Sequence, residues 1–178
     1  MPNYRRAHEG GATYFFTVVT YRRQPVLLQP DVLDTLRTAF RDVRKERPFK
    51  LDAIVILPDH LHAMLTLPPG NPDFSARWGM IKRHVSKNVV SEDEKPVNAS
   101  MASRQESGFW QRRFWEHQIR NDDDYARHMD YIHFNPVKHG YAKSPTDWPH
   151  SSFHKCVERG LYPADWASGA DIDGEFGE

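Results

Sequence analysis

His60 and His62 are the residues whose types and spacing first suggest chemistry. They follow an apolar run at residues 53–57 and open a second strand-like run at residues 61–67. Side chains two apart on a strand point to the same face, so the two imidazoles would stand side by side and reach one metal ion. A His-x-His pair is also often incidental, so this pair alone leaves the choice open.

Tyr131 and Asn135 form a second candidate pair. They fall in or next to a helix expected at about residues 123–134, which should end before Pro136 because a residue preceding proline is disfavoured in a helix. Side chains four apart on a helix project from one face. If that face looks at the histidines, the site holds two imidazoles, an amide oxygen and a phenol.

That ligand mixture suits Mn²⁺ or Mg²⁺ better than a structural zinc, which prefers four closed ligands. A tyrosine beside such an ion would be a nucleophile, and the cation would polarise a phosphodiester. Tyr131 could instead simply pack in the core, and sequence spacing alone favours this structural role.

The elements that must position these residues follow the order β-α-β-β-α-β and then a helix. Strands are expected at residues 13–21, 51–57, 61–67 and 109–119, and helices at residues 31–46, from 73 or 75 to about 89, and at 123–134. The order predicts an α+β, ferredoxin-like split β-α-β fold: a four-stranded antiparallel sheet with helices on one face, a third helix that carries the tyrosine, and an irregular C-terminal extension.

We expect one catalytic domain over residues 1–150, in which the polar stretch 91–108 is a mobile loop. Residues 151–178 would form a C-terminal extension with an acidic tail.

Charge and cysteine content narrow the class of protein. Lys plus Arg and Asp plus Glu both number 24, so the formal net charge is zero, which argues against a protein that coats DNA by bulk charge but allows a basic face. Cys156 is the single cysteine, which excludes an intrachain disulfide and a cysteine metal cage. Without an apolar N-terminal segment or a membrane-length run, we expect a cytoplasmic protein that does not enter the membrane.

Two stretches carry a resemblance to a known family. Residues 57–62 (LPDHLH) resemble the histidine motif of HUH-type single-strand endonucleases, and residues 131–140 (YIHFNPVKHG) resemble the tyrosine motif of the REP-associated tyrosine transposases. Further landmarks of that family are similar at residues 10–18, 114–117, 119–121 and 147–149. The resemblance covers nearly the whole chain in order, and the stretch 91–108 is longer than the family usually carries.

The resemblance implies the roles of the site residues. Tyr131 corresponds to the catalytic tyrosine and His60 and His62 to the metal ligands, while Asn135 is assigned as a third ligand by analogy with related single-tyrosine transposases. The implied reaction is metal-dependent cleavage and rejoining of single-stranded DNA through a 5′-phosphotyrosine, with Mg²⁺ or Mn²⁺ and without a nucleotide cofactor. The implied substrate is a REP hairpin with a short tetranucleotide at its 5′ foot, and the protein would act as a monomer on nucleoid DNA.

Several basic and aromatic residues would then contact DNA. The candidates are Arg5, Arg6, Arg77, Lys82, Arg83, Arg112, Trp115 and Lys138. A solvated surface of mixed charge and an aromatic core are the alternatives for these residues.

Two other functions stay open from the sequence: a catalytically silent protein that binds REP hairpins, and a metal-dependent phosphodiesterase in which water attacks. His117 or His133 would be alternative metal ligands to Asn135, although His133, two residues from Tyr131 on a helix, should face away from it.

Overall fold

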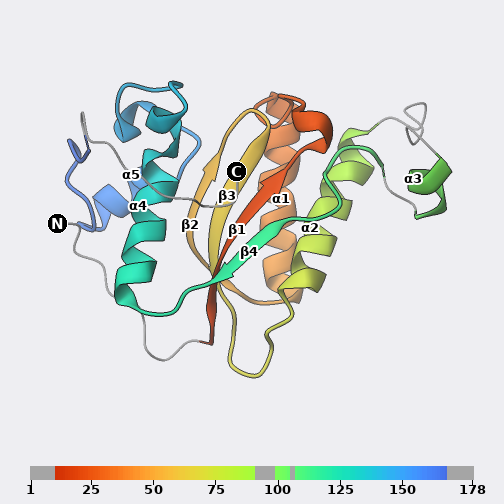
Figure 1. The fold of residues 1–178 in the computed structure, drawn as a ribbon, viewed down its shortest axis with the longest axis horizontal. Coiled ribbons are helices and arrows are strands. Elements are labelled where there is room, and N and C mark those ends of the chain that lie inside the picture. Colours follow the sequence, from red (N-terminus) through yellow and green to blue (C-terminus); the bar gives the residue numbers. More distant parts are fainter. Residues whose placement is uncertain (1–10, 91–98, 105–106, 168–178) are drawn as a thin grey trace.

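A four-stranded antiparallel sheet crosses the middle of the protein with its strands in the order β2-β3-β1-β4 (Figure 1). The structure is a computed structural model, and it describes residues 11–90, 99–104 and 107–167. The strands are β1 (Thr13–Val19), β2 (Lys50–Ile56), β3 (His60–Thr66) and β4 (Trp115–Gln118). The helices are α1 (Pro30–Glu46), α2 (Phe74–Val89), α3 (Ala99–Ser103), α4 (Asp122–Lys138) and α5 (Phe153–Glu158).

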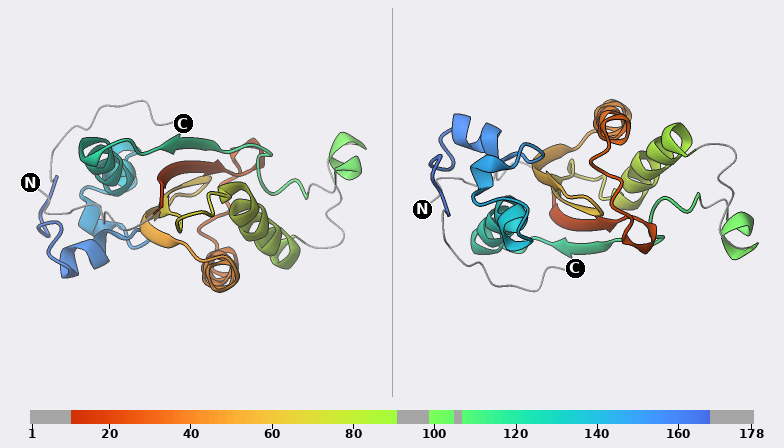
Figure 2. Two further views of the ribbon diagram at one scale, coloured as in Figure 1. Left: turned by 90° about the horizontal axis from the view of Figure 1, so that it is seen from below. Right: turned by 90° about the horizontal axis from the view of Figure 1, so that it is seen from above.

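Helices cover both faces of this sheet. Figure 2 shows α1 and α2 on one side, and α4 with the C-terminal helix α5 on the other. The strand order and the antiparallel pairing are those of the predicted ferredoxin-like fold, with α1 and α2 as its two helices on one face. The additional helix α4 packs on the opposite face, mainly against β2 and β3.

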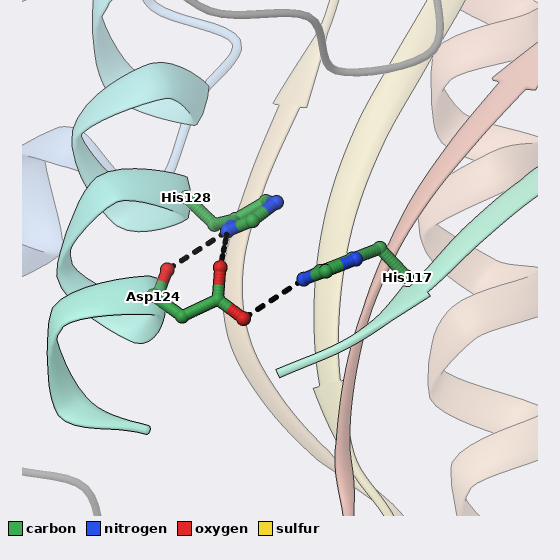
Figure 3. A group of neighbouring side chains, drawn as sticks. All are labelled: His117, Asp124 and His128. Atoms are coloured by element: carbon green, nitrogen blue, oxygen red, sulfur yellow. Dashed lines mark hydrogen bonds and ion pairs between the residues drawn. The ribbon is translucent and has the colours of Figure 1, made fainter. Parts of the chain in front are cut away.

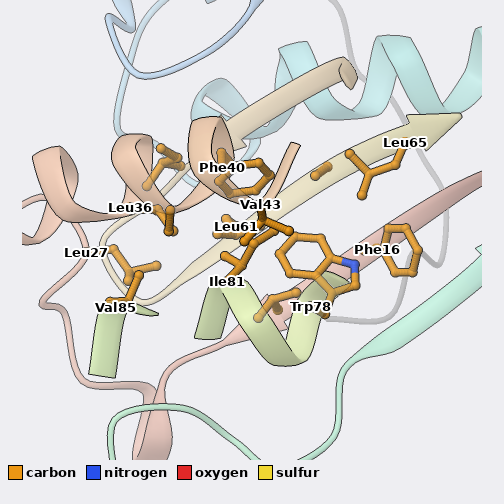
Figure 4. Close-up of a cluster of buried hydrophobic side chains, with 14 of the residues drawn as sticks. Phe16, Leu27, Leu36, Phe40, Val43, Leu61, Leu65, Trp78, Ile81 and Val85 are labelled. Atoms are coloured by element: carbon orange, nitrogen blue, oxygen red, sulfur yellow. The ribbon is translucent and has the colours of Figure 1, made fainter. Parts of the chain in front are cut away.

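The alternation of side chains along β3 divides the hydrophobic interior in two. Leu61, Ala63 and Leu65 face α1 and α2, where they join a cluster that also contains Phe16 and Trp78 (Figure 4). His60, His62 and Met64 occupy the alternate positions and face α4. Because β3 is buried on both faces, a slip of one residue in its pairing would bury its histidines among the aliphatic residues and is strongly disfavoured.

Side-chain caps mark the starts of α2 and α4, whereas α1 begins after Gln29 without a side-chain cap, and Asp31 lies within its first turn. Asp73 accepts a hydrogen bond from the backbone N–H of Ala76 at the start of α2, and Asn121 accepts one from Asp124 at the start of α4. Side-chain oxygens at these positions satisfy backbone donors that the helix leaves without a partner.

The predicted ends of two elements are wrong. Helix α4 does not stop at Asn135 but continues through Pro136 to Lys138. Near the end of a helix proline removes a single hydrogen bond, and the burial of Asn135 and Pro136 compensates for it. Strand β4 is also shorter than the predicted 109–119, because residues 109–111 only touch the end of β1 through isolated backbone hydrogen bonds.

The loop predicted at residues 91–108 falls largely outside the described residues, and its described part contains α3. In the C-terminal region, Phe153 and Cys156 of α5 and the following Tyr162 pack into the cluster under α4. The boundary at residue 150 stays a prediction. No helix among the described residues is both long and apolar enough to cross a bilayer.

Arg77, predicted to contact DNA, has a structural role instead. Its side chain is 0 % exposed, and its guanidinium donates to the backbone carbonyls of Arg47, Pro48 and Asp73. The carbonyls belong to the turn before β2 and the loop before α2, so this side chain ties two connections together and cannot reach a phosphate. From helical spacing we expected Arg77 on the outward, polar face of α2. That spacing could not predict that the two connections cover the side chain.

Replacing Arg77 should therefore destabilise the fold rather than weaken DNA binding. Arg77→Met leaves several buried carbonyls unsatisfied and should lower the free energy of unfolding by about 2–4 kcal/mol. Urea unfolding measures the change, with the exposed Arg83→Met as the control, expected to change stability by less than about 0.5 kcal/mol. Equal small effects for both variants would contradict this role of Arg77.

Candidate active site

The two histidines stand side by side at the start of β3, as their spacing predicts. Their ring centroids are 4.9 Å apart, and both side chains are buried. The Nδ1 atom of His60 lies 2.6 Å from a carboxylate oxygen of Asp59, and the Nδ1 atom of His62 lies 2.9 Å from the hydroxyl of Thr17. Partners on one ring nitrogen fix the orientation of the ring, as they do for metal-bound histidines.

The other nitrogens of these rings are suited to bind a metal. The Nε2 atoms of His60 and His62 and the Oδ1 atom of Asn135 are all buried, and Nε2 of His60 has no hydrogen-bond partner within the described residues. A buried ring nitrogen without a partner is costly unless something else satisfies it. Two imidazole nitrogens and an amide oxygen fit a divalent cation of the Mn²⁺ or Mg²⁺ kind.

Burial keeps His62 in the neutral form that a metal ligand requires. Loss of solvation holds the pKa of the His62 imidazole well below its ordinary value, and the neighbouring His60 adds to the effect. For Asp59, partial burial acts to raise the pKa, but the hydrogen bond from His60 and the ion pair with Arg23 outweigh it and leave the pKa of the carboxyl lowered. Asp59 is therefore ionised at neutral pH and orients the His60 ring.

Helix α4 and its C-terminal cap residue place three side chains beside the pair of histidines. Tyr131 packs beside His62, with ring centroids 5.2 Å apart, and His139 lies beside His60 at 5.3 Å. Asn135 is buried and lies four residues from each of them, so helical spacing puts its side chain on the same face as theirs. The structure thus brings His60, His62 and Tyr131 together and adds His139, while the role of Asn135 as a ligand stays a prediction.

Lys138 contacts Tyr131, the predicted nucleophile, rather than a distant part of the surface. Its Nζ atom donates a hydrogen bond of 3.3 Å to the hydroxyl of Tyr131 and also lies 4.9 Å from the centre of the tyrosine ring. Burial lowers the pKa of the Lys138 amine. An ammonium group at the phenol oxygen stabilises the phenolate, which is the reactive form.

Phe15 of β1 holds α4 at this distance from the sheet. Its ring packs on His62 at 5.4 Å, on Tyr131 at 6.0 Å and on His128 at 4.8 Å. It thereby connects the predicted metal ligands with the predicted nucleophile. The sequence placed Phe15 in a strand and within the family-like stretch at residues 10–18, but gave no sign of these contacts.

A second group of polar side chains joins β4 to α4 (Figure 3). Nε2 of His117 lies 2.8 Å from one carboxylate oxygen of Asp124, and Nδ1 of His128 lies 3.1 Å from the other. The ligand atoms of these residues lie within 4.8 Å of one another, close enough for a metal ion. The sequence suggested His117 as an alternative metal ligand to Asn135 but gave no sign of Asp124 and His128 beside it. These residues come together through the pairing of β4 with β1.

The remaining predicted residues take varied positions. Arg83 and Arg112 are exposed, Trp115 is partly exposed, and Lys82 donates to the backbone carbonyls of Gln111 and Arg112. Their contacts with DNA stay predictions. Arg5 and Arg6 lie outside the described residues.

His133 faces away from Tyr131, as expected. Its Nε2 atom lies 2.8 Å from the hydroxyl of Ser152, so the ring points toward the segment that precedes α5. Burial lowers the pKa of its imidazole to about 3. It is therefore not an alternative to Asn135.

Comparison with known proteins identifies the family. The model of the family "Transposase IS200 like" matches residues 10–135. A REP-associated tyrosine transposase of Escherichia coli K12 is 45 % identical over 167 residues, which cover 94 % of this chain and 92 % of that protein. The chain belongs to the REP-associated tyrosine transposases.

Other members of this transposase family agree over nearly the full length. A relative from Haemophilus influenzae is 42 % identical over 172 residues, or 97 % of each chain. A solved structure of a REP-associated tyrosine transposase bound to a REP hairpin superposes with a TM-score of 0.77 at 43 % identity, covering 99 % of this chain and 96 % of that one. The resemblance seen in the sequence is confirmed, and the protein is an enzyme of the transposase type.

The two histidine groups make a direct test of metal binding. His60→Ala or His62→Ala should weaken Mn²⁺ binding at least about tenfold, because each removes one of the three predicted ligands. Isothermal titration calorimetry on protein shown by circular dichroism to be folded measures the affinity. The matched control, His117→Ala, should bind Mn²⁺ like the wild type, and the reverse pattern would place the ion in the group of Figure 3.

Proposed function

We propose that this protein is a metal-dependent endonuclease and strand transferase that cuts and rejoins single-stranded DNA at REP-type hairpins through a 5′-phosphotyrosine. The observation that carries the proposal is the position of Tyr131, beside His62 and with the ammonium of Lys138 at its hydroxyl. Family membership and the REP hairpin bound to the similar solved structure support the choice of DNA and of hairpin.

Each site residue then has a role. His60, His62 and Asn135 would hold the divalent cation, which when bound polarises the scissile phosphodiester and neutralises developing charge. Asp59 and Thr17 orient the two imidazoles. Lys138 stabilises the phenolate of Tyr131, since a free phenol has a pKa of about 10 and is a weak nucleophile at neutral pH.

The reaction exchanges one phosphodiester for another. The phenol of Tyr131 loses its proton, its oxygen bonds to phosphorus, and the bond from phosphorus to the 3′ oxygen breaks. The 3′ oxygen takes up a proton and leaves as a free hydroxyl, while the 5′ phosphate stays on Tyr131. Attack by a 3′ hydroxyl reverses the steps, so the covalent bond conserves the energy and no nucleotide cofactor is required.

The burial of the site restricts the form of DNA that can react. Tyr131 is 1 % exposed and rigidly packed on α4, so DNA entry requires that neighbouring groups move aside. An unpaired strand can bring its phosphate in line with the phenol, whereas a stacked duplex obstructs that approach. We therefore propose unpaired DNA next to a hairpin as the substrate. That the protein acts as a monomer stays a prediction from the family resemblance.

Two other functions fit parts of the structure less well. A silent hairpin-binding protein would not need the histidines, Tyr131 and Lys138 in one place. A phosphodiesterase that uses water would leave the contact between Lys138 and the tyrosine hydroxyl without a purpose.

Tyr131→Phe distinguishes these functions because it removes a single oxygen atom. The variant should fold and bind the hairpin but should form no covalent adduct and no cut product. Incubation with single-stranded hairpin DNA and Mg²⁺, followed by a denaturing gel, reports both. The exposed Tyr141→Phe serves as the matched control and should cut normally. An adduct formed by Tyr131→Phe would assign the reaction to another tyrosine, and cut products without an adduct in the wild type would assign it to water.

The substrate preference follows from the need for an unpaired strand. The enzyme should cut a REP-type hairpin with an unpaired 5′ foot at least about tenfold faster than the same sequence in a full duplex or an unrelated single strand. Affinity should fall as salt rises, because basic residues act on phosphates, while preference for the foot sequence should persist. Equal cleavage rates on the three DNAs would show a nonspecific nuclease.

A further inference from the structure

A polar cavity of about 330 Å³ lies between β4 and the first turns of α4, next to the candidate active site but outside it. Trp115 and His117 of β4 line it on one side, and Asp123, Arg127 and His128 of α4 on the other. The polar group of Figure 3 also lines this cavity, but none of the roles proposed for the catalytic residues uses it.

The register of the sheet places the cavity close to the histidine pair. Trp115 pairs with Thr17 across β1 and β4, and Thr17 pairs with His62 across β1 and β3. The three side chains therefore form one row on the α4 face of the sheet. Neighbouring strands lie about 4.8 Å apart, so Trp115 stands about 10 Å from His62. A DNA strand bound at the histidines would therefore need only a short extended segment to reach the cavity.

Trp115 is held in a stacked column of rings. Its ring lies nearly parallel to His117, at 5.9 Å and 7°, and His117 lies nearly parallel to His128, at 4.8 Å and 13°. The carboxylate of Asp124 accepts a hydrogen bond from His117, and its backbone carbonyl accepts one from His128, so Asp124 holds both rings in place (Figure 3). Trp115 nevertheless remains 38 % exposed. A fixed, exposed indole is a suitable surface for stacking an unpaired base.

Charged groups around the indole match the rest of a nucleotide. Arg120 and Arg127 also line the cavity, and within residues 11–90, 99–104 and 107–167 neither makes an ion pair. Guanidinium groups of this kind bind phosphate oxygens. The carboxylate of Asp123 is an acceptor for the amino group of a base edge. Arg127 is also one helical turn before Tyr131, on the side of α4 that leads to the nucleophile.

We propose that this cavity binds one unpaired nucleotide of the strand that is cut, with its base stacked on Trp115, its phosphate held by Arg120 and Arg127, and its base edge read by Asp123. The inference rests on the proposed function, because it assumes a DNA substrate. It assigns the recognition of one position of the single-stranded foot to residues outside the catalytic group.

Binding measurements in EDTA test the proposal without any cleavage. Fluorescence anisotropy would compare a hairpin that carries an unpaired foot with the same hairpin lacking the foot. Trp115→Ala should weaken binding of the foot-bearing hairpin about fivefold to a hundredfold, the range of base stacking on an aromatic ring, and leave binding of the footless hairpin within about twofold. Trp115→Phe should keep most of the affinity. Equal losses on both hairpins, or none on either, would overturn the proposal.

Arg127→Ala gives a second variant that leaves the ring column intact. It should weaken the foot-bearing hairpin selectively and reduce the slope of log affinity against log salt by about one. Arg44→Ala removes the same charge from an exposed position of α1, on the other side of the sheet, and should show no preference between the two hairpins. A larger effect of Arg44→Ala would contradict the assignment.

An abasic scan of the foot identifies the bound position. At one nucleotide, removal of the base should weaken wild-type binding markedly but weaken Trp115→Ala binding little, because stacking has already been lost. Additive losses at every position would show that no base stacks on Trp115. If Trp115→Ala changes neither hairpin while His117→Ala removes a bound Mn²⁺, the cavity is a cation site and the proposal is wrong.

These outcomes are separable from those for the proposed function. A protein that shows the coupling at one foot position but never cuts would contradict only the proposed function. A protein that cuts through Tyr131 without any coupling to Trp115 would contradict only the nucleotide site.

Discussion

The packing of Phe15 against α4 is the contact on which the site depends. One ring touches His62 on the sheet, Tyr131 and His128 on the helix, and Trp115 on the edge strand at 5.8 Å. It sets how far the phenol stands from the imidazoles, which sequence distance leaves undetermined. A shift of about 1 Å in such a spacing is enough to impair catalysis, so a rigid aromatic contact suits this position better than a flexible side chain.

The two faces of the sheet have different roles. The face under α1 and α2 is almost wholly apolar and supplies stability, with residues such as Leu61 and Trp78 fully buried. The face under α4 mixes apolar residues with histidines that have fixed partners. Polar groups buried in this way raise the cost of any misalignment, because each one loses a hydrogen bond if the helix moves.

Much of this arrangement could be predicted from the sequence. A two-residue period placed His60 and His62 on one face, a four-residue period placed Tyr131 with Asn135, and the order of elements gave the sheet. What failed depended on packing between distant segments. Arg77 had the spacing of an outward-facing residue, yet loops from two other connections cover it. Pro136 suggested the end of a helix, but burial carries α4 past it. The stacking of Trp115 on His117 and His128 depends on the register of β4, which no local pattern encodes.

The position of α4 in the chain has a consequence for synthesis of the protein. All four strands precede this helix, and the histidines are made long before the tyrosine. A ribosome-bound chain that ends before α4 has the sequence of the complete sheet but exposes the face that carries Phe15 and Met64. Its histidines have no phenol beside them. If Tyr131 is the nucleophile, as proposed, no covalent bond to DNA can form before α4 has docked on the sheet, so the reactive state appears only after all four strands have been made.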